Sequence, residues 1–597
     1  MKYALPTRFQ ITGVALTLFG LVVILQMVNI QGNANVMRIR DHSNLVYENN
    51  IERITPERGT IYDRWGNLLA GNKEVYEVGV ELKTVNKLGN EATIAGVLAN
   101  VLGLDYQDTL SRISTPYDPA NQQVYVVVAD FVSPAKIEQL RSIKDEYQKL
   151  YANQNKNGGS TQLLSGVNWN PHLQRTYPEN YLAANILGFY SMLDIEKGEA
   201  HLGVEEKYNA LLRGNPVEVA SPVDPNKIKQ FVQVPPGSSL ILTIDREIQA
   251  NIEEILDNAV INNGAQSGAI TVMDPKTGEI IAMASNPRMN PNVYWEYQDN
   301  YFNRNIDITY EPGSVFKVLT MAIALETEAV EPDTEFIDTG SINIGGINIY
   351  NWDRAAWGPQ DMTGCLQHSL NVCLAWIATE IGPKDFYKYL LEFGMGQRTN
   401  VDLAGEVSWP LSIPGGTWVD ADIAAHSFGQ GLAVTPIQMV TAISAVANDG
   451  KMMSPHILKS VIDNGQRRDS SPMVIGKPIS EETADTLSEM LANSLEREAS
   501  SALVPGYRLA GKTGTAEIAG PNGYTVSEGT NASFVGWGPI DDPQFIVYVW
   551  IEKPTSSIWG SVVAAPVFHD VVSQLVVLMD IPPDDIRHQL NQLLVKE

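Results

Sequence analysis

An uncharged apolar run near the N-terminus constrains this chain more than any other feature of its sequence. No charged residue occurs from Phe9 to Met37, and within that stretch the 18 residues Ile11–Val28 read ITGVALTLFGLVVILQMV. A helix needs roughly 20 apolar residues to cross a bilayer. A cleavable signal peptide has a shorter apolar core and a small-residue cleavage site, which QGNAN at 31–35 matches poorly. We therefore predict an uncleaved transmembrane helix at 9–30 after a short cytoplasmic tail at 1–8.

The rest of the chain has the composition of a globular protein. It has 597 residues in all and an apolar fraction of 44%, so it can form several domains with buried cores. The formal charge of −27 at pH 7 argues against a nucleic-acid-binding surface, which needs a basic patch, and against broad adhesion to anionic lipid. We expect no nucleic-acid partner.

The two cysteines, Cys365 and Cys373, are eight residues apart and lack the neighbouring ligands of a zinc site. If both lie in one helix, they are separated by about 12 Å along its axis, which is too far for a disulfide. We therefore interpret them as buried apolar side chains. The sequence predicts neither a metal nor a cofactor.

Turn residues and changes of periodicity divide the chain beyond the anchor. ERGTIYDRWGNLLA at 57–70 predicts two strands around a turn, NQNKNGGST at 153–161 a polar loop, and GVEEKYNALLRG at 203–214 a helix. VPPGSSL at 234–240 is the best candidate for a domain boundary. Beyond it, a strand and a long amphipathic helix precede a β-hairpin at 269–285, AITVMDPKTGEIIAMAS. We expect the C-terminal half to be a mixed α/β domain.

Residues 310–317, YEPGSVFK, place a hydroxyl and an amine at the start of an apolar helix. Ser314 follows a Pro-Gly pair, and Lys317 lies three residues later on the same helical face. A serine needs a base to act as a nucleophile, and a lysine whose pKa is lowered by burial or by a nearby cation can be that base. Taken alone, however, the pattern fits a serine helix cap followed by a surface lysine better.

Two further groups of polar residues follow. In HSLNVCLAWIA, Ser369 and Asn371 could point a hydroxyl and an amide into a cleft, although a helix cap is the better explanation of this motif alone. In LAGKTGTAEI, a glycine inside a predicted strand indicates close approach of a ligand or of another backbone. The lysine and threonines around it could hold a carboxylate, and the alternative is an edge strand with solvated side chains.

The order and spacing of the three motifs change this interpretation. Ser369 follows Ser314 by 55 residues (369 − 314), and Lys512 follows it by 198 (512 − 314). A Ser-x-x-Lys motif, a Ser-x-Asn type motif and Lys-Thr-Gly in this order form the signature of class A β-lactamases and penicillin-binding proteins. Together the three motifs favour a serine acyl-enzyme over three unrelated structural features.

With these motifs the chain resembles the class B penicillin-binding proteins, which are membrane-anchored, monofunctional peptidoglycan D,D-transpeptidases. RGTIYDRWGNLLA at 58–70, with YPENYLAANILGFY and LGVEEKYNALLRG, is similar to the family's pedestal, while GQGLAVTPIQM at 429–439 and NASFVGWGPIDDPQFIVYVWIEKP at 531–554 are similar to its transpeptidase domain. The resemblance implies an α+β fold with a pedestal domain at 31–235. It implies a transpeptidase domain at 236–597 that has a five-stranded antiparallel sheet and a helical subdomain.

The same resemblance implies roles for the residues of the first two motifs. Ser314 would be the acyl-enzyme nucleophile, and Lys317 would take its proton. Ser369 would relay protons toward the leaving amine. Asn371 would orient the amide of the donor peptide.

In the third motif, Lys512 would add positive potential, and Thr513 and Thr515, on either side of Gly514, would bind the terminal carboxylate of the donor. The oxyanion hole would be formed by the backbone N–H groups of Ser314 and Thr515. The second motif here is Ser-Leu-Asn, which keeps both polar ends and changes only the variable middle position.

For function, the resemblance implies cross-linking of peptidoglycan stem peptides from D-Ala-D-Ala donors and covalent binding of β-lactams. It implies as partners the lipid-linked precursor, a polytopic glycan-polymerising membrane protein and other cell-wall machinery. The protein would be a single-pass protein of the bacterial cell membrane with its catalytic domain on the extracytoplasmic side. The sequence alone gives little support for this orientation, because basic residues flank the apolar run on both sides.

Several alternatives stay open at this point. DMTGCLQHSLNVCLAWIA, the compact pedestal and FVGWGPIDDPQF favour the septal, cell-division type over the elongation type. A β-lactamase or an antibiotic sensor would share the motifs but would lack the pedestal. A D,D-carboxypeptidase, which uses water as the acceptor, and a non-catalytic assembly protein of the division machinery are the remaining alternatives.

Overall fold

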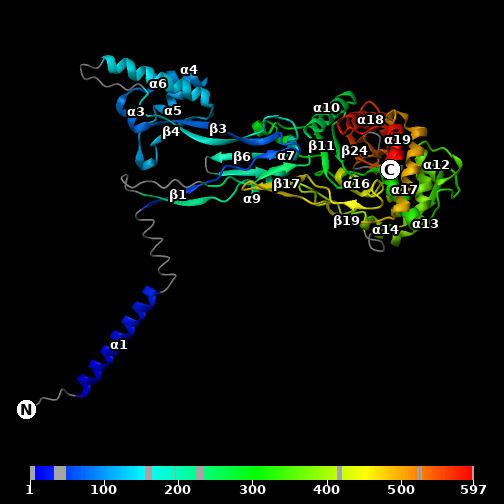
Figure 1. Ribbon diagram of the computed structural model, residues 1–597, viewed down its shortest axis with the longest axis horizontal. Coiled ribbons are helices and arrows are strands. Elements are labelled where there is room, and N and C mark those ends of the chain that lie inside the picture. The colour runs from blue at the N-terminus through cyan, green and yellow to red at the C-terminus, as the bar shows by residue number, and fades with distance from the viewer. Residues whose placement is uncertain are drawn as a thin grey trace, which may run out of the picture. The chain divides into compact units, whose positions relative to one another are not determined.

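The computed structural model (Figure 1) describes residues 7–32, 49–154, 164–194, 197–222, 234–412, 420–520, 523–524 and 528–594. Residues 1–6 of the predicted cytoplasmic tail and most of the predicted polar loop lie outside these residues, and the last two residues of the predicted tail begin the first helix. Contacts group the chain into two units, Met1–Glu57 with Arg213–Gly237 and Arg58–Leu212 with Ser238–Glu597.

The first unit contains a long apolar helix and a strand pair. The helix α1 (Thr7–Gly32) includes a 19-residue stretch, Ile11–Asn29, that is apolar enough to cross a membrane and of which none is buried by the rest of the protein. Strand β1 (Asn49–Ile54) pairs antiparallel with β8 (Val217–Pro222). An apolar helix that the described part of the chain does not bury fits a membrane anchor.

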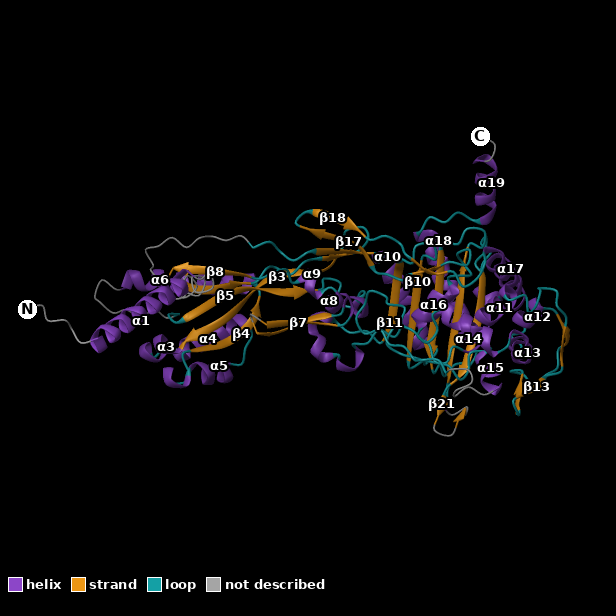
Figure 2. Ribbon diagram, turned by 90° about the horizontal axis from the view of Figure 1, so that it is seen from below, coloured by secondary structure: helices purple, strands orange, loops and turns teal. Residues whose placement is uncertain are grey.

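The second unit is built around a five-stranded antiparallel sheet, whose strands are seen in Figure 2. Side chains alternate along its strands: on β24, Val547 and Val549 face one core, while Ile546, Tyr548 and Trp550 face another. Both faces are therefore covered by other parts of the protein, as period-two alternation of apolar residues requires. In spatial order the strands are β11 (Ile280–Asn286), β10 (Ser267–Met273), β24 (Phe545–Glu552), β23 (Thr530–Gly538) and β20 (Ala510–Glu517).

Helices cover both faces of this sheet. On one face α10 (Arg246–Asn262), which is capped by the Asp245 side chain, packs beside α18 (Gly560–Leu578). Helix α18 is also long and apolar enough to span a membrane, but half of it is buried in this core. The other face is covered by α11 (Lys317–Glu326), α16 (Pro436–Ile443) and α17 (Glu481–Glu498), and α13 (Asn371–Ile381) packs against α11.

A second sheet of seven strands joins the pedestal region to the C-terminal region. Its order is β18 (Gln466–Asp469), β17 (Leu458–Asp463), β9 (Ser239–Leu242), β2 (Ile61–Tyr62), β3 (Leu68–Glu81) and β4 (Tyr125–Val132), with β5 (Val167–Thr176) also paired to β3. A separate apolar core lies beneath α4 (Glu91–Leu102), α5 (Tyr106–Ile113) and α6 (Pro134–Gln154).

The predicted α+β fold, with its pedestal and five-stranded antiparallel sheet, is confirmed. The predicted hairpin at 269–285 is formed by β10 and β11. The predicted helix at 203–214 is divided into α8 (Gly203–Lys207) and α9 (Asn209–Leu212), because Tyr208 leaves the helix and its hydroxyl donates to Asp402.

Candidate active site

Ser314 lies on a short 3₁₀ turn, Gly313–Phe316, that leads directly into α11. Its side chain is half-buried, whereas its neighbours Val315 and Phe316 are fully buried in the core. In a 3₁₀ turn residues i and i+3 eclipse one another, so Ser314 and Lys317 lie on the same side, as predicted. The apolar residues anchor this turn and leave the hydroxyl accessible.

Glycines allow the Ser314 turn to approach the edge strand β20 closely. A Cβ on Gly514 would collide with Ser533 Oγ and would lie 2.8 Å from Val315 Cγ1. Gly313 has a φ of +59°, and a Cβ there would lie 2.6 Å from the backbone oxygen of Thr515. The glycine in the third motif therefore does mark close approach of another backbone, which brings the Lys-Thr-Gly strand beside the Ser314 turn.

Lys317 is the first residue of α11, and its side chain is 0% exposed. Its Nζ lies 2.7 Å from the backbone oxygen of Ser369, 3.1 Å from Ser369 Oγ and 2.7 Å from Asn371 Oδ1. Burial, and then the positive charge of Lys512, lower the pKa of Lys317 well below its usual value. The amine is thus biased toward its neutral form, which can accept a proton.

Within the described part of the chain, the hydrogen bonds of Lys317 go to the second motif and none goes to the Ser314 hydroxyl. Catalytic hydrogen bonds are often long or misaligned until substrate binds, so this geometry is compatible with a base and its nucleophile. The sequence predicted that Ser314 and Lys317 share a face but did not predict that the amine contacts the second motif.

Ser369 lies between two helices rather than within one. Helix α12 (Met362–Gln367) ends before it, α13 begins at Asn371, and Ser369 has a left-handed φ of +53°. This backbone conformation costs a residue with a Cβ about 1–2 kcal/mol. It directs the Ser369 backbone oxygen to Lys317 Nζ.

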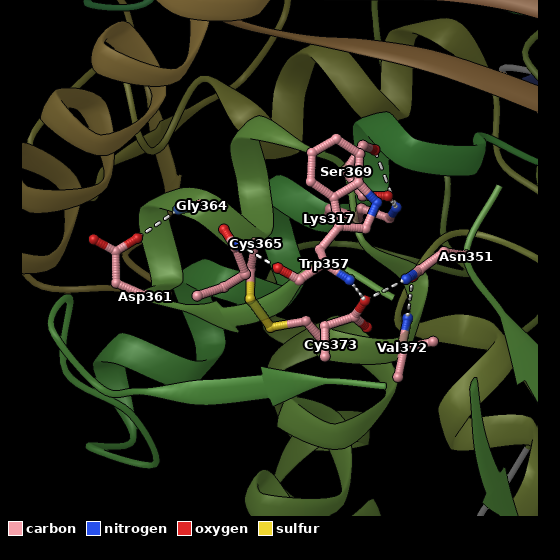
Figure 3. Close-up of a disulfide and its surroundings, with 11 residues drawn as sticks. Lys317, Asn351, Trp357, Asp361, Gly364, Cys365, Ser369, Val372 and Cys373 are labelled. Atoms are coloured by element: carbon pink, nitrogen blue, oxygen red, sulfur yellow. Dashed lines mark hydrogen bonds between the residues drawn. A yellow bond between two sulfur atoms is a disulfide. The ribbon is translucent and has the colours of Figure 1, made fainter. Parts of the chain in front are cut away.

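The break at Ser369 overturns our expectation for the cysteines. Cys365 and Cys373 form a disulfide, with their Cα atoms 6.0 Å apart (Figure 3). The expectation assumed one continuous helix, in which the two side chains would be too far apart to bond. Because the chain turns between α12 and α13, the two cysteines face each other across the turn.

The third motif completes the cluster from the sheet edge. Lys512 is 4% exposed, and its Nζ lies 3.1 Å from Ser369 Oγ. Thr513 and Thr515 alternate with buried neighbours along β20 and are both half-exposed on the same face. The Thr515 hydroxyl accepts a hydrogen bond of 2.9 Å from the backbone N–H of Gly560, the first residue of α18. This last contact had no signal in the sequence.

The structure therefore brings all three motifs to one place. Lys317 contacts Ser369 and Asn371, Ser369 contacts Lys512, and Gly514 lies against the Ser314 turn. The Ser314 hydroxyl near the buried amine of Lys317 can form and break an ester with a substrate. The amine of Lys512 and the hydroxyls of Thr513 and Thr515 lie next to them and can hold a carboxylate of that substrate. Among the described residues, no group of three His, Cys, Asp or Glu side chains is placed to hold a metal ion.

Family models match two parts of the chain. The penicillin-binding protein transpeptidase domain matches residues 268–573, which is 306 of the 597 residues (573 − 268 + 1), and the penicillin-binding protein dimerisation domain matches residues 53–236. These matches cover the five-stranded sheet with the three motifs and the pedestal region, respectively.

Curated relatives and solved structures agree with these matches. Stage V sporulation protein D of Bacillus subtilis is 31% identical over 90% of this chain and 80% of its own length, and the peptidoglycan D,D-transpeptidase FtsI of Escherichia coli K12 is 28% identical over 89% and 86%. The crystal structure of penicillin-binding protein 2X from Streptococcus thermophilus has the same fold, with a TM-score of 0.73, 24% identity and coverage of 88% and 80%. Penicillin-binding protein 3 from Mycobacterium tuberculosis, in complex with aztreonam, has a TM-score of 0.66, 25% identity and coverage of 89% and 98%.

Proposed function

Because this chain belongs to the family of penicillin-binding proteins with a transpeptidase domain, we infer that it is a serine D,D-transpeptidase that cross-links the stem peptides of peptidoglycan. It is of the cell-division type and binds β-lactams. We propose that the three motifs carry the reaction, with Ser314 as the nucleophile and Lys317 as its base.

One observation carries these roles. The buried amine of Lys317 is held by the backbone oxygen and hydroxyl of Ser369 and by the amide oxygen of Asn371, and Lys512 reaches the same hydroxyl. Burial opposes the charged form of an amine, so a methionine at this position would stabilise an apolar core better than a lysine does. Its position beside an accessible hydroxyl supports a catalytic role.

The first half-reaction follows from this arrangement. Neutral Lys317 takes the proton of Ser314 while the hydroxyl oxygen attacks the carbonyl carbon between the two D-alanines of the donor. We propose that the backbone N–H groups of Ser314 and Thr515 stabilise the developing oxyanion, since such donors are each worth about 3–4 kcal/mol. The proton then passes through Ser369 to the leaving D-alanine amine, and the donor stays bound to Ser314 as an ester.

The second half-reaction reverses these proton transfers. An amine of the acceptor stem peptide attacks the ester carbonyl, loses its proton toward Ser369 and Lys317, and releases Ser314 with its proton restored.

During the first half-reaction, Asn371 would hold the donor amide, while Lys512, Thr513 and Thr515 would hold the carboxylate of the departing D-alanine. Because β20 is the edge strand of its sheet, the donor peptide can extend along it by backbone pairing.

We propose that the catalytic region lies on the extracytoplasmic side of the membrane in which α1 anchors the chain. Two observations support this orientation. Peptidoglycan is assembled outside the membrane, and disulfides such as Cys365–Cys373 persist mainly in oxidising compartments.

We further propose that α1 and the pedestal bind a polytopic glycan-polymerising membrane protein, since α1 is apolar and not buried by its own chain. Replacing α1 with an unrelated membrane-spanning helix should abolish co-purification of that partner.

The central test is covalent labelling by a fluorescent penicillin. The purified full chain should become labelled, with the mass increase of one penicillin on the Ser314 peptide, and Ser314→Ala should not be labelled. Ser471→Ala, which changes an exposed serine outside the site, is the matched control and should be labelled like the unaltered chain. Labelling that persists in Ser314→Ala would overturn the assignment of the nucleophile.

A further inference from the structure

The disulfide Cys365–Cys373 encloses the second motif symmetrically. Ser369 is four residues from each cysteine, with Cys365 in α12 and Cys373 in the first turn of α13. Both cysteines are 0% exposed. Figure 3 shows the disulfide at the turn between the two helices, close to Ser369 and Lys317. The bond thus closes a short covalent ring that includes both residues to which the Lys317 amine donates, Ser369 and Asn371.

The backbone inside this ring adopts an unfavourable conformation at Ser369. Ser369 has a left-handed φ of +53°, which residues with a Cβ rarely adopt without support from their surroundings. The same conformation sends its backbone oxygen to Lys317 Nζ, at 2.7 Å. Relaxation of Ser369 to an ordinary helical or extended conformation would turn this oxygen away from the amine.

Hydrogen bonds at the turn act with the disulfide. The N–H of Leu370 donates to the backbone oxygen of Cys365, at 3.0 Å, and the N–H of Val372 donates to Asn351 Oδ1, at 3.2 Å. Asn351 is itself held by Asp338 Oδ2, at 2.8 Å. The bonds of Leu370 and Val372 are single hydrogen bonds between neutral groups, and Asp338 acts on the turn only through Asn351. The disulfide adds a covalent link between α12 and α13 to the one that the chain itself makes through residues 368–370.

We propose that the Cys365–Cys373 disulfide is a positioning element of the transpeptidase reaction, which fixes the turn between α12 and α13 so that Ser369 and Asn371 stay within hydrogen-bonding distance of Lys317 Nζ. The inference rests on the proposed function, because it assumes that Lys317 activates Ser314. A catalytic group displaced by about 1 Å can lose roughly a hundredfold in rate, so a small change at this turn is enough to be measured.

A disulfide that only stabilises the fold has a different consequence. It would raise the temperature of unfolding but would leave the acylation rate of the folded protein unchanged. A positioning disulfide changes the acylation rate at temperatures where every molecule is folded. The two roles are therefore separated by measuring rate and stability on the same proteins.

The test compares the double variant Cys365→Ala/Cys373→Ala with the full, oxidised chain. We expect its second-order rate constant for acylation by a fluorescent penicillin to fall by about tenfold or more, well below the unfolding transition. Ile377→Ala, which opens a cavity in α13 one turn beyond Cys373 and leaves the disulfide intact, is the control. It should lower the unfolding temperature and leave the rate within about twofold. Equal rates in the double variant and the full chain would overturn the proposal.

A double-mutant cycle with Asn371→Ala tests whether the disulfide acts through the motif. If it does, Asn371→Ala should cost less in the Cys365→Ala/Cys373→Ala background than in the full chain, because the two changes remove the same arrangement. Losses that simply multiply would contradict a positioning role. If the double variant does not fold, the native chain reduced with dithiothreitol supplies the comparison. Its rate should fall and should return on re-oxidation, and an unchanged rate after complete reduction would overturn the proposal.

These outcomes are distinguishable from failure of the proposed function. If the full chain is not labelled, or Ser314→Ala is labelled, the proposed function is wrong, whatever the cysteine variants do. If the full chain is labelled at Ser314 and the double variant is acylated at the same rate, only the inference about the disulfide is wrong.

Discussion

Two buried polar clusters in the same unit differ in how their charges are compensated. In the pedestal region, Glu205 is 0% exposed and accepts hydrogen bonds of 2.7 Å from both Arg58 Nε and Arg175 Nε. In the active site, Lys317 is also 0% exposed, but its partners are neutral oxygens and the other cation nearby is Lys512.

The pKa values of both buried groups are lowered, but with opposite consequences for charge. A lowered pKa keeps the carboxyl of Glu205 charged and makes the amine of Lys317 neutral. Burial alone would raise the pKa of Glu205, but Arg175 and Arg58 outweigh it and lower the pKa below its usual value, so the carboxylate stays charged. For Lys317, burial and Lys512 act in the same direction and favour the neutral amine. The pedestal cluster thus holds three segments together, whereas the cluster around Lys317 favours the neutral amine that the proposed base requires, at a cost in stability.

Lys317→Met should produce the largest effect and should separate activity from stability. Removal of a general base lowers the rate by about 10²–10⁴-fold, so penicillin acylation should be lost nearly completely. The unfolding temperature should stay the same or rise. Lysine binds a proton in the unfolded chain below its ordinary pKa of 10.5 and binds it less tightly when folded, so its burial costs stability at neutral pH.

The measurements for this variant are the acylation rate constant and the thermal unfolding midpoint. A variant that keeps its acylation rate would show that another group is the base. A variant whose thermal unfolding midpoint falls by several degrees would show that Lys317 stabilises the fold as Glu205 does. The contrast between the two clusters would then fail.

Glu205→Gln should show the reverse pattern, with a loss of stability and no change in chemistry. It leaves Arg58 and Arg175 buried without their counter-charge, and breaking a buried pair in this way costs about 3–5 kcal/mol. Urea unfolding of the purified variant and of the native chain would measure the loss. Glu138→Gln, which changes the exposed ion pair with Arg141, is the control and should cost less than about 1 kcal/mol.

The stability conferred by Glu205 should also depend on pH. Since its pKa is lowered in the folded state, its contribution is fully present above the unfolded pKa and is lost as the pH falls through the folded one. The difference in unfolding free energy between the native chain and Glu205→Gln should therefore shrink in acid. A difference that grows in acid would mean that the carboxyl is protonated in the native fold.

The general fold could be predicted from the sequence because its signals are local or are carried by the motifs. The DPKTGE turn between two apolar runs predicted the β10–β11 hairpin. The glycine in LAGKTGTAEI indicated close approach of a ligand or of another backbone, and the structure identifies this neighbour as the Ser314 turn. The buried Glu205 cluster joins Glu205, in the predicted helix at 203–214, to Arg58, in the segment 57–70, and to Arg175, near the end of β5. These segments are joined by contacts between residues that are 30 and 147 positions apart in the sequence, which no local pattern reveals.

The disulfide was missed because of one backbone conformation. Its prediction required that α12 and α13 be recognised as separate helices, and the signals for this are weak: Asp361 caps α12, and Asn371 begins α13 after the left-handed Ser369. Serine is not a typical left-handed residue, since glycine and asparagine are favoured there. The same departure from a regular helix explains why the sequence did not reveal the backbone oxygen of Ser369 as a partner of Lys317.

Lys512→Gln should produce the smallest effect, and it tests the repulsion between the two active-site cations directly. The charge of Lys512 is the second cause, after burial, of the lowered pKa of Lys317, so its removal should raise that pKa toward the usual value. In the proposed mechanism acylation needs neutral Lys317, so the acylation rate should fall as the pH drops through that pKa. The acid limb of the rate profile should therefore move to higher pH in Lys512→Gln. The pH of this acid limb should stay unchanged in Glu205→Gln and in Lys451→Gln, which changes a half-exposed lysine. A limb that stays in place in Lys512→Gln, whatever the loss in maximal rate, would mean that burial alone keeps Lys317 neutral and that Lys512 serves only the substrate carboxylate.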